Sequence, residues 1–225
     1  MISVILATRD DETALAHALA ALVPAAADGL LREAIIVDGG SRDGTALVAD
    51  AAGCRFIAGE GVLGRDLARG AAAARSDWLL FLSPHVLMEP AWQREVSDFI
   101  ERVRLSGDPR RVGIFRGARA AFGVRPRLAE MGAALRLRCF AAPYLEEGLL
   151  ISARFYRELG GHRDGSDFVD VDLARRIGRR RMSCLRARAF LRSEGAPPQR
   201  GNWRLALFLI GLLPRRIGSS LRSAR

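Results

Sequence analysis

The sequence predicts an α/β protein built on a mostly parallel sheet flanked by helices. Apolar strand-like runs and helix-like segments alternate four times within residues 1–105. This alternation is typical of parallel strands joined by helical crossovers. The chain has 225 residues, 49% of them hydrophobic, which is enough for one domain with its own core. We therefore expect a single domain over residues 1–200, with a regular half (1–105) and a less regular half (106–200), and a separate tail (201–225).

Short apolar runs between helix-breaking residues define the elements of the first half. Leu15, Leu19 and Leu22 recur at helical spacing after a first apolar strand. We expect the segment from Pro24 to Gly29 to break that helix. The predicted strands are 2–7, 35–37, 54–58 and 78–82, and the predicted helices after the first are 45–52, 65–75 and 90–105.

The second half shows weaker periodicity. Residues 111–116 could form an edge strand, and a polar loop runs into a strand that ends at Ser152. Acidic residues occupy the first turn of a helix predicted over 168–179. Further predicted elements are helices at 126–140, 154–159 and 203–213 and a strand at 182–191.

One stretch, IIVDGGSRDGT over residues 35–45, organises the chain. Asp38 stands where a buried strand ends, and ligands of open parallel sheets bind beyond such ends. Gly40 lets the backbone turn sharply and approach a ligand. Ser41 or Asp43 can cap the following helix. Asp38 could bind a ligand, or it could only shape the turn before the glycines.

Composition restricts the partners and the compartment. The net charge is +10, and every basic side chain apart from histidine is arginine, so anionic partners such as phosphates or lipid headgroups are favoured. No nucleic-acid motif accompanies the charge, so we expect no nucleic-acid partner. Three cysteines without Cys-x-x-Cys spacing indicate a reducing compartment and no disulfide framework. The N-terminus resembles a first strand rather than a signal peptide, which predicts a cytoplasmic protein.

Several motifs follow one another in a fixed order along the chain: SVILAT (3–8), IIVDGGSRDGT (35–45), Gly64-Arg65, WLLFL (78–82), Pro143-Tyr144, Gly148-Leu149-Leu150, Leu159-Gly160-Gly161 and Asp170-Val171-Asp172-Leu173. Together they resemble family 2 glycosyltransferases of the GT-A fold, and within them the bacterial selenodomain-associated transferases. The resemblance covers nearly the whole chain and implies a Rossmann-like sheet, with residues 1–105 as the nucleotide-sugar-binding half and 106–200 as the acceptor and catalytic half. It also implies inverting transfer to an acceptor hydroxyl, aided by a divalent cation, Mn²⁺ or Mg²⁺.

The resemblance also suggests site residues. Asp170 is the candidate catalytic base, although an acidic residue also suits a helix N-terminus for structural reasons alone. Asp172 is expected to face away from the site. Arg65 follows a glycine-rich loop at a helix start, where anions bind well, but it could instead be a solvated helix residue. The residues expected to bind the donor are Thr8, Asp38, Gly40, Gly64, Arg65, Ser83 and Glu146.

Two departures from the family bring the activity into question. The family's metal-binding Asp-x-Asp is Ser83-Pro84-His85 here, and hard cations prefer carboxylate oxygens. His85 could be a metal ligand suited to Mn²⁺ more than Mg²⁺, or an ordinary loop residue. The family's Glu-Asp at the catalytic helix is Val169-Asp170. If the cation is lost, arginines such as Arg65 and those of 175–181 would have to neutralise the leaving diphosphate.

Two functions from different classes therefore remain. The first is an active glycosyltransferase that uses a nucleotide-sugar donor. The second is a catalytically impaired descendant that binds nucleotide or serves as a scaffold.

The tail combines an apolar run with flanking arginines over 203–216. It fits a C-terminal helix lying on the inner face of a membrane, close to a lipid-linked acceptor, or a helix packed on the core or in a dimer contact.

Overall fold

The computed structural model describes residues 1–119, 148–163 and 169–192. Its strands are β1 (Ile2–Thr8), β2 (Leu31–Asp38), β3 (Arg55–Ala58), β4 (Trp78–Leu82), β5 (Val86–Met88), β6 (Val112–Arg119), β7 (Leu149–Ser152) and β8 (Met182–Leu191). Its helices are α1 (Glu12–Ala27), α2 (Thr45–Ala51), α3 (Leu63–Ala73), α4 (Trp92–Ser106), α6 (Ala153–Glu158), α7 (Val169–Ile177) and the short 3₁₀ helix η2 (Arg179–Arg181).

The described strands form one mixed, mostly parallel sheet in the order β3-β2-β1-β4-β7-β6-β8-β5. β3, β2, β1 and β4 are parallel neighbours, β7 runs antiparallel between β4 and β6, and β5 closes the far edge against β8. The register places Thr8 opposite Asp38, and Leu6 opposite Leu82. The carboxyl ends of β1, β2 and β4 therefore meet at one edge of the sheet, as the sequence predicts.

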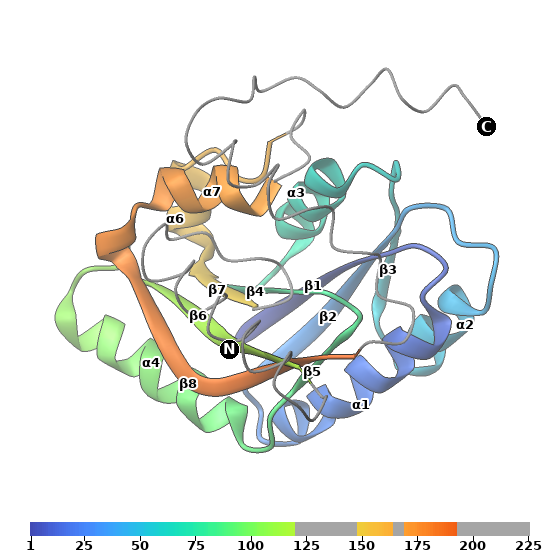
Figure 1. Cartoon of the computed structure of the whole chain (residues 1–225), viewed down its shortest axis with the longest axis horizontal. Helices are drawn as coiled ribbons and strands as arrows, with labels where there is room; N and C mark the ends of the chain where they lie inside the picture. Colours follow the sequence, from blue (N-terminus) through green and yellow to red (C-terminus); the bar gives the residue numbers. More distant parts are fainter. Residues whose placement is uncertain (120–147, 164–168, 193–225) are drawn as a thin grey trace.

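Helices cover both faces of this sheet (Figure 1). Alternate residues of β1 point to opposite faces: Leu6 packs in the cluster formed with α1, α2 and α4, and Ile5 packs in the cluster formed with α3, α6 and α7. Both side chains are fully buried. The period of two along a strand thus supplies two separate apolar layers from a continuous apolar run.

The helix break predicted over residues 24–29 is confirmed, but it falls after Pro24. α1 continues through Pro24 to Ala27. Proline removes one backbone donor, and the next residue, Ala25, is fully buried in the core. Gly29 follows the helix with a φ of 71°, and the Leu30 amide donates to the Ala25 carbonyl at 3.0 Å.

Two strands of the second half also differ from expectation. β6 was predicted as an edge strand, but it lies inside the sheet between β7 and β8. β5, which follows His85 directly, was not predicted. Both errors concern pairings between residues far apart in sequence, on which local periodicity carries no information. The β6–β8 pairing shifts register between Ile114 and Arg116. At this shift the amides of Arg186 and Ala187 donate hydrogen bonds to the Glu95 carboxylate on α4, at 2.8 and 3.2 Å.

The helices predicted at 126–140 and 203–213, the contact expected through 203–216, Glu146 and the boundary after residue 200 lie outside the described residues. Within the described part of the chain, no helix has the length and apolar character that crossing a membrane requires.

Candidate functional site

The site begins where β1 and β2 end side by side. Asp38 is 8% exposed, and its carboxylate accepts hydrogen bonds from the amides of Gly40 (3.1 Å) and Ser41 (2.8 Å) and from the Ser41 hydroxyl. The Thr8 hydroxyl donates to the same carboxylate at 3.3 Å, and the Gly39 amide donates to the Thr8 carbonyl at 2.8 Å. Asp38 therefore shapes its own turn, and Gly40, with a φ of 91°, completes it.

The loops after β1 and β2 are tied together by carboxylates that accept backbone N–H groups. Asp10 accepts from the Arg42 amide at 2.7 Å, and Glu12 accepts from the Gly44 amide at 2.9 Å. Asp43 accepts from the Glu12 amide and from Thr45. Partial burial acts to raise the pKa of the Asp43 carboxyl, but the hydrogen bonds from Thr45 and Glu12 outweigh it and lower that pKa overall. These hydrogen bonds between the two loops hold the ends of β1 and β2, and with them Thr8 and Asp38, side by side.

The loop after β3 closes the same edge. The Gly59 amide donates to the Asp38 carbonyl at 2.7 Å, and a Cβ on Gly39 would lie 3.0 Å from the Gly61 Cα. Within this loop the Glu60 carboxylate pairs with Arg65 at 2.7 Å, with both side chains at least half exposed. Exposed pairs of this kind are weak, so a phosphate could compete with Glu60 for Arg65.

α3 brings this loop against the start of α7. A Cβ on Gly64 would lie 2.7 Å from the Arg163 carbonyl oxygen and 3.3 Å from Val169 Cγ1. Asp170 is the next residue, in the first turn of α7, with its side chain 15% exposed. The predicted donor residue Gly64 and the candidate base Asp170 are thus near neighbours in space, although more than a hundred residues separate them in the sequence.

Behind Asp170 lies a buried aromatic cluster on β4. The His162 ring packs edge-on to Phe81, with centroids 4.7 Å apart, and Phe81 packs on Tyr156 at 5.1 Å. The Tyr156 hydroxyl lies 2.8 Å from His162 Nδ1, and His162 Nε2 lies 3.6 Å from Asp170 Oδ1. Burial raises the pKa of the Tyr156 phenol to about 12.

At the end of β4, the predicted donor contact Ser83 and the predicted metal ligand His85 both bond to other residues of the protein. The Ser83 hydroxyl accepts the His85 amide at 3.3 Å, and His85 Nε2 lies 3.1 Å from Asp11 Oδ1 at the start of α1. No group of three histidine, cysteine, aspartate or glutamate side chains suited to a metal occurs among the described residues. As described, Ser83 and His85 therefore do not fit the divalent cation that the family resemblance implies.

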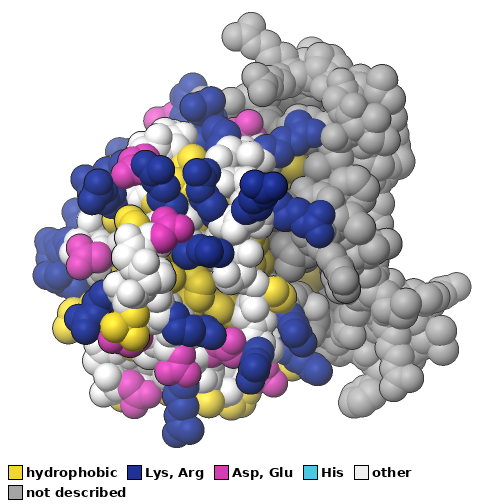
Figure 2. Space-filling view, turned by 90° about the vertical axis from the view of Figure 1, so that its left-hand side faces the viewer, with side chains coloured by type: hydrophobic (Ala, Val, Ile, Leu, Met, Phe, Trp, Pro, Cys, Tyr) yellow, Lys and Arg dark blue, Asp and Glu magenta, His cyan; other side chains and the backbone are white. Residues whose placement is uncertain are grey.

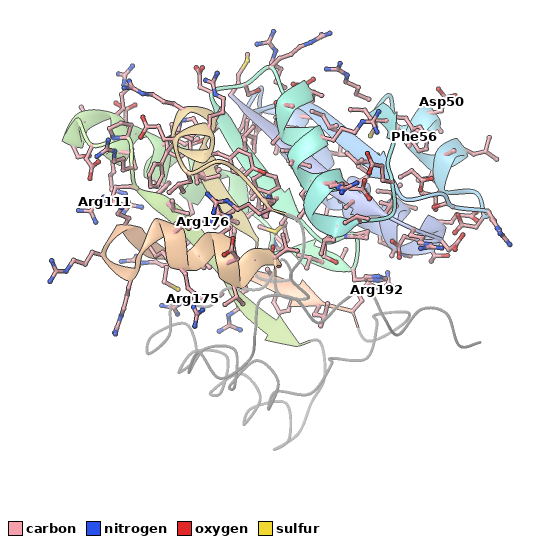
Figure 3. The ribbon with its side chains drawn as sticks, turned by 90° about the horizontal axis from the view of Figure 1, so that it is seen from above. Asp50, Phe56, Arg111, Arg175, Arg176 and Arg192 are labelled. Atoms are coloured by element: carbon pink, nitrogen blue, oxygen red, sulfur yellow. The ribbon has the colours of Figure 1, made fainter. Side chains whose placement is uncertain are left out.

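The arginines of α7 and η2 behave in two ways. Arg176 lies between α7 and α6 (Figure 3), bonded to Asp172 at 2.8 Å and to the Leu159 carbonyl at 2.6 Å. Asp172 thus serves as a structural ion-pair partner. Arg179 to Arg181 are exposed, but Arg181 donates to the Ile177 carbonyl at 3.2 Å and lies over the Phe155 ring at 5.7 Å. Figure 2 shows a face of the molecule on which arginine and acidic side chains intermingle. Arg176 and Arg181 thus have structural contacts, and Arg179 and Arg180 are solvated.

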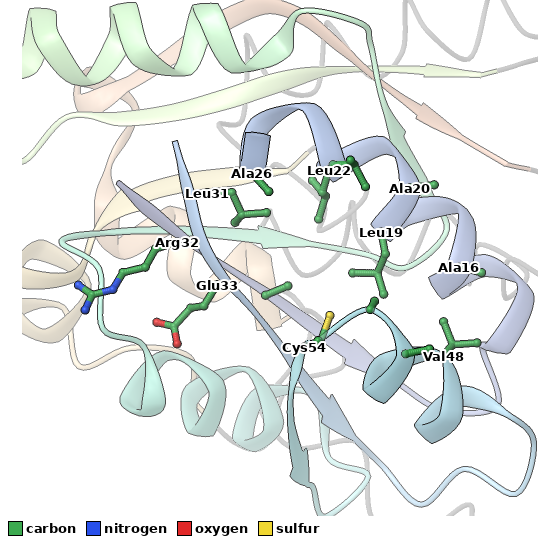
Figure 4. A pocket seen from close by; sticks show the side chains of 15 residues that line it. Ala16, Leu19, Ala20, Leu22, Ala26, Leu31, Arg32, Glu33, Val48 and Cys54 are labelled. Atoms are coloured by element: carbon green, nitrogen blue, oxygen red, sulfur yellow. The ribbon is translucent and has the colours of Figure 1, made fainter. Parts of the chain in front are cut away.

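One apolar pocket among the described residues lies away from this site. A pocket of about 610 Å³ opens between α1, α2 and the amino-terminal end of β2 (Figure 4), lined by residues such as Leu19, Leu31 and Val48. None of the predicted site residues lines it. Because ligands of parallel sheets bind at the carboxyl ends, we place the site at Thr8, Asp38 and Gly64 and not in this pocket.

Sequence reasoning missed three residues of the site. Asp11, the partner of His85, precedes α1 in an acidic run with no metal-ligand spacing. His162 and Tyr156 carry no motif of their own. Their only sequence signal is that His162 directly follows Gly160-Gly161, one of the motifs that carry the family resemblance.

A GT-A-like α/β sheet with polar groups and glycines gathered at the carboxyl ends of β1, β2 and β4, and a carboxylate approaching from a later helix, defines the class of nucleotide-dependent transferases. The sequence profile described as "Glycosyl transferase family 2" matches residues 3–120. The chain belongs to this family, as its motifs predict.

Solved structures share the fold. A mycobacterial protein aligns with 95% of this chain and 76% of its own, at 22% identity and a TM-score of 0.66. The alignment with glucosyl-3-phosphoglycerate synthase from Mycobacterium tuberculosis covers 95% of this chain and 82% of the synthase chain, at 22% identity and a TM-score of 0.60. The alignment with TarS from S. aureus (residues 1–349) covers 84% of this chain and 60% of the TarS chain, at 13% identity and a TM-score of 0.62. Structures of the synthase hold Mn²⁺ and UDP-glucose. No sequence among curated proteins matches the chain.

Proposed function

We propose that the protein transfers a sugar from a nucleotide-sugar donor to an acceptor hydroxyl with inversion at the anomeric carbon. The observation that carries this proposal is the position of Asp170, a mostly buried carboxylate that adjoins the donor-side loop through Gly64. In the proposed step, Asp170 takes the acceptor proton while the acceptor oxygen bonds to the anomeric carbon. The bond from that carbon to the diphosphate breaks, and the nucleoside diphosphate leaves.

In this proposal, the residues predicted to bind the nucleotide-sugar donor contact different parts of it. Asp38 and Thr8 present oxygen atoms at the ends of β2 and β1, where the nucleoside would lie, and the Gly39–Gly61 contact keeps the approach free of side chains. Arg65 would exchange Glu60 for a donor phosphate, because its ion pair is exposed. Gly40, Ser83 and Glu146 remain predicted donor contacts.

Mn²⁺ is bound by the synthase of known structure, and a cation at His85 remains a prediction for this chain. No group of three metal-ligating side chains occurs among the described residues, so in this proposal an arginine shares with any cation the neutralisation of the leaving diphosphate. Because Arg65 is exposed, it is the residue we propose to balance the charge of the leaving diphosphate.

A panel of nucleotide sugars tests the proposal, with UDP-glucose first, and with small phosphorylated acids and lipid-linked hydroxyl compounds as acceptors. Purified protein is assayed for nucleotide release and glycosylated product, with and without Mn²⁺. We expect product formation that Asp170→Asn reduces at least about 100-fold, with donor binding retained. Unchanged turnover in Asp170→Asn would refute the role of Asp170.

A non-catalytic nucleotide-binding role is the second candidate, and the His85–Asp11 pair favours it. His85 replaces the second carboxylate of the Asp-x-Asp that the resemblance implies, and its Nε2 lies 3.1 Å from Asp11 Oδ1. Donor binding in calorimetry without turnover under any metal would support this function. Absence of nucleotide binding would refute both candidates.

The remaining expectations also stand as proposals. We propose a single transferase domain over residues 1–200, a cytoplasmic location and a peripheral membrane contact through 203–216 that brings the site to its acceptor. Cys54 and Cys184 are free thiols, in keeping with a reducing compartment.

A further inference from the structure

Behind the candidate base, two buried polar side chains form a chain that ends at its carboxylate. Tyr156 on α6 contacts His162, and His162 faces Asp170 on α7. The His162 side chain has no exposed surface. A buried imidazole is costly unless its two ring nitrogens are matched to a donor and an acceptor. The partners of these nitrogens therefore determine which of them carries the proton.

The partners of the Tyr156 hydroxyl fix the tautomer of His162. The hydroxyl oxygen accepts the backbone N–H of His162 at 2.9 Å, so its own hydrogen is available for His162 Nδ1 at 2.8 Å. Nδ1 is then the acceptor, and Nε2 carries the hydrogen. The opposite tautomer would direct the Nε2 lone pair at the Asp170 carboxylate, which is repulsive. Burial raises the pKa of Tyr156 to about 12, so the phenol stays a donor at physiological pH.

The Nε2–H group is aimed at the candidate base but stops short of a hydrogen bond. Nε2 lies 3.6 Å from Asp170 Oδ1 and is a buried nitrogen without a hydrogen-bond partner among the described residues. Hydrogen bonds of catalytic groups are often long without substrate and shorten in the reacting complex. A shift of about half an ångström would bring these two atoms within hydrogen-bond range.

We propose that Tyr156 and His162 are positioning residues for Asp170. Tyr156 holds His162 as the Nε2–H tautomer, and that N–H orients the Asp170 carboxylate toward the acceptor hydroxyl. The inference rests on the proposed function for its catalytic consequence. The tautomer of His162 does not depend on any activity.

The first test is therefore spectroscopic. In protein labelled with ¹⁵N-histidine, two-bond ring correlations distinguish a protonated from an unprotonated nitrogen. We expect wild-type His162 to be protonated at Nε2 and unprotonated at Nδ1, and Tyr156→Phe to shift it toward a mixture. His17, exposed on α1, is the reference signal and is assigned with His17→Gln. A wild-type His162 protonated at Nδ1 would overturn the inference.

The second test is kinetic and uses conservative variants. His162→Phe keeps an aromatic ring against Phe81 but removes the donor, and we expect kcat to fall about 10–100-fold with little change in the KM for the donor. In His162→Gln, the amide nitrogen reaches the place of Nε2 and should restore most of that loss. His17→Gln should leave both constants unchanged. Equal kcat values for wild type and a folded His162→Phe would overturn the inference.

The outcomes separate this inference from the proposed function. If Asp170→Asn abolishes turnover while His162→Phe and Tyr156→Phe do not alter it, the function stands and the positioning role fails. If wild-type protein shows no turnover with any donor, the function fails, and the ¹⁵N measurement still decides the tautomer. A KM effect without a kcat effect would also contradict the positioning role.

Discussion

Gly64→Ala tests the contact between the donor-side loop and the helix of the candidate base. The new methyl carbon would lie 2.7 Å from the Arg163 carbonyl oxygen and 3.3 Å from Val169 Cγ1. The Arg163 carbonyl and α3 would have to separate by about 0.7 Å to reach ordinary van der Waals contact, and Val169 at the start of α7 would have to give by about 0.1 Å. Overpacking of this kind costs about 1–3 kcal/mol, and alanine returns up to about 1 kcal/mol of helix propensity.

We therefore expect a net loss of about 1–2 kcal/mol in the free energy of unfolding, or a fall of about 2–8 °C in Tm for a chain of this size. The catalytic effect should be larger, because Asp170 follows Val169 directly. Misplacing a catalytic group by about 1 Å can cost about 100-fold, so we expect kcat to fall at least about tenfold.

Gly70→Ala is the matched control on the same helix. Its methyl carbon would lie 2.6 Å from Ile5 Cγ2 and 3.0 Å from Val37 Cγ2, against the sheet and away from α7. Thermal unfolding and nucleotide-release kinetics are measured for both variants. Gly70→Ala should lose stability while its kcat stays within about twofold of wild type. The reasoning fails if Gly64→Ala keeps the wild-type kcat, or if both variants lose kcat equally.

Three further predictions concern titration and the altered metal motif. Asp43→Asn should lower the free energy of unfolding by about 1 kcal/mol or less. Because hydrogen bonds lower the folded-state pKa of Asp43, the difference in unfolding free energy between wild type and variant, measured in urea, should be full above the unfolded pKa of about 4 and shrink below it. A difference independent of pH would contradict this. Tyr156→Phe should remove from the ultraviolet titration curve the phenol that ionises near pH 12. In wild type, the folding stability due to the raised pKa of Tyr156 should be lost between about pH 10 and 12. Ionisation of Tyr156 near pH 10 in the folded protein would be inconsistent with its burial. Ser83→Asp combined with His85→Asp should raise Mn²⁺ affinity at least about tenfold in calorimetry, and an unchanged affinity would show that the lost carboxylates are not the defect.

The first half of the fold could be predicted because its information is local. Residues 35–37 predict a buried strand, and the residues after Asp38 predict a turn; both predictions are confirmed. The helix break predicted over 24–29 is also found, but it comes only after Ala27, because α1 continues through Pro24 and Ala25 is fully buried. The place of β6 inside the sheet depends on β7 and β8, and these pairings leave no periodic trace in the sequence.

The position of Asp38 was readable for the same reason, while the roles of the site residues stay predictions. Asp38 stands in a motif and lies at the end of β2, beside Thr8 at the end of β1. The partners of the polar groups could not be predicted: Asp11 reaches His85 from another loop, and Tyr156 reaches His162 through a turn closed by Gly161, whose φ of 61° is not readable from spacing. Hydrogen-bond networks of this kind depend on angles and distances that only the folded chain defines.

The path of β5 has a consequence for how the chain folds. After β4, the backbone crosses to the far edge of the sheet, where Val86 pairs with Leu191 and the Glu89 carboxylate accepts the amide of Arg188, 99 residues away. Pairings of such long range raise the contact order and slow folding. The two sequence halves are thus interlocked, so residues 1–105 expressed alone would leave β5 without its partner β8 and β4 paired on one side only, with β1. Pairing of β5 must wait for the last described strand, and a ribosome-bound chain lacking β8 would expose open strand edges to aggregation.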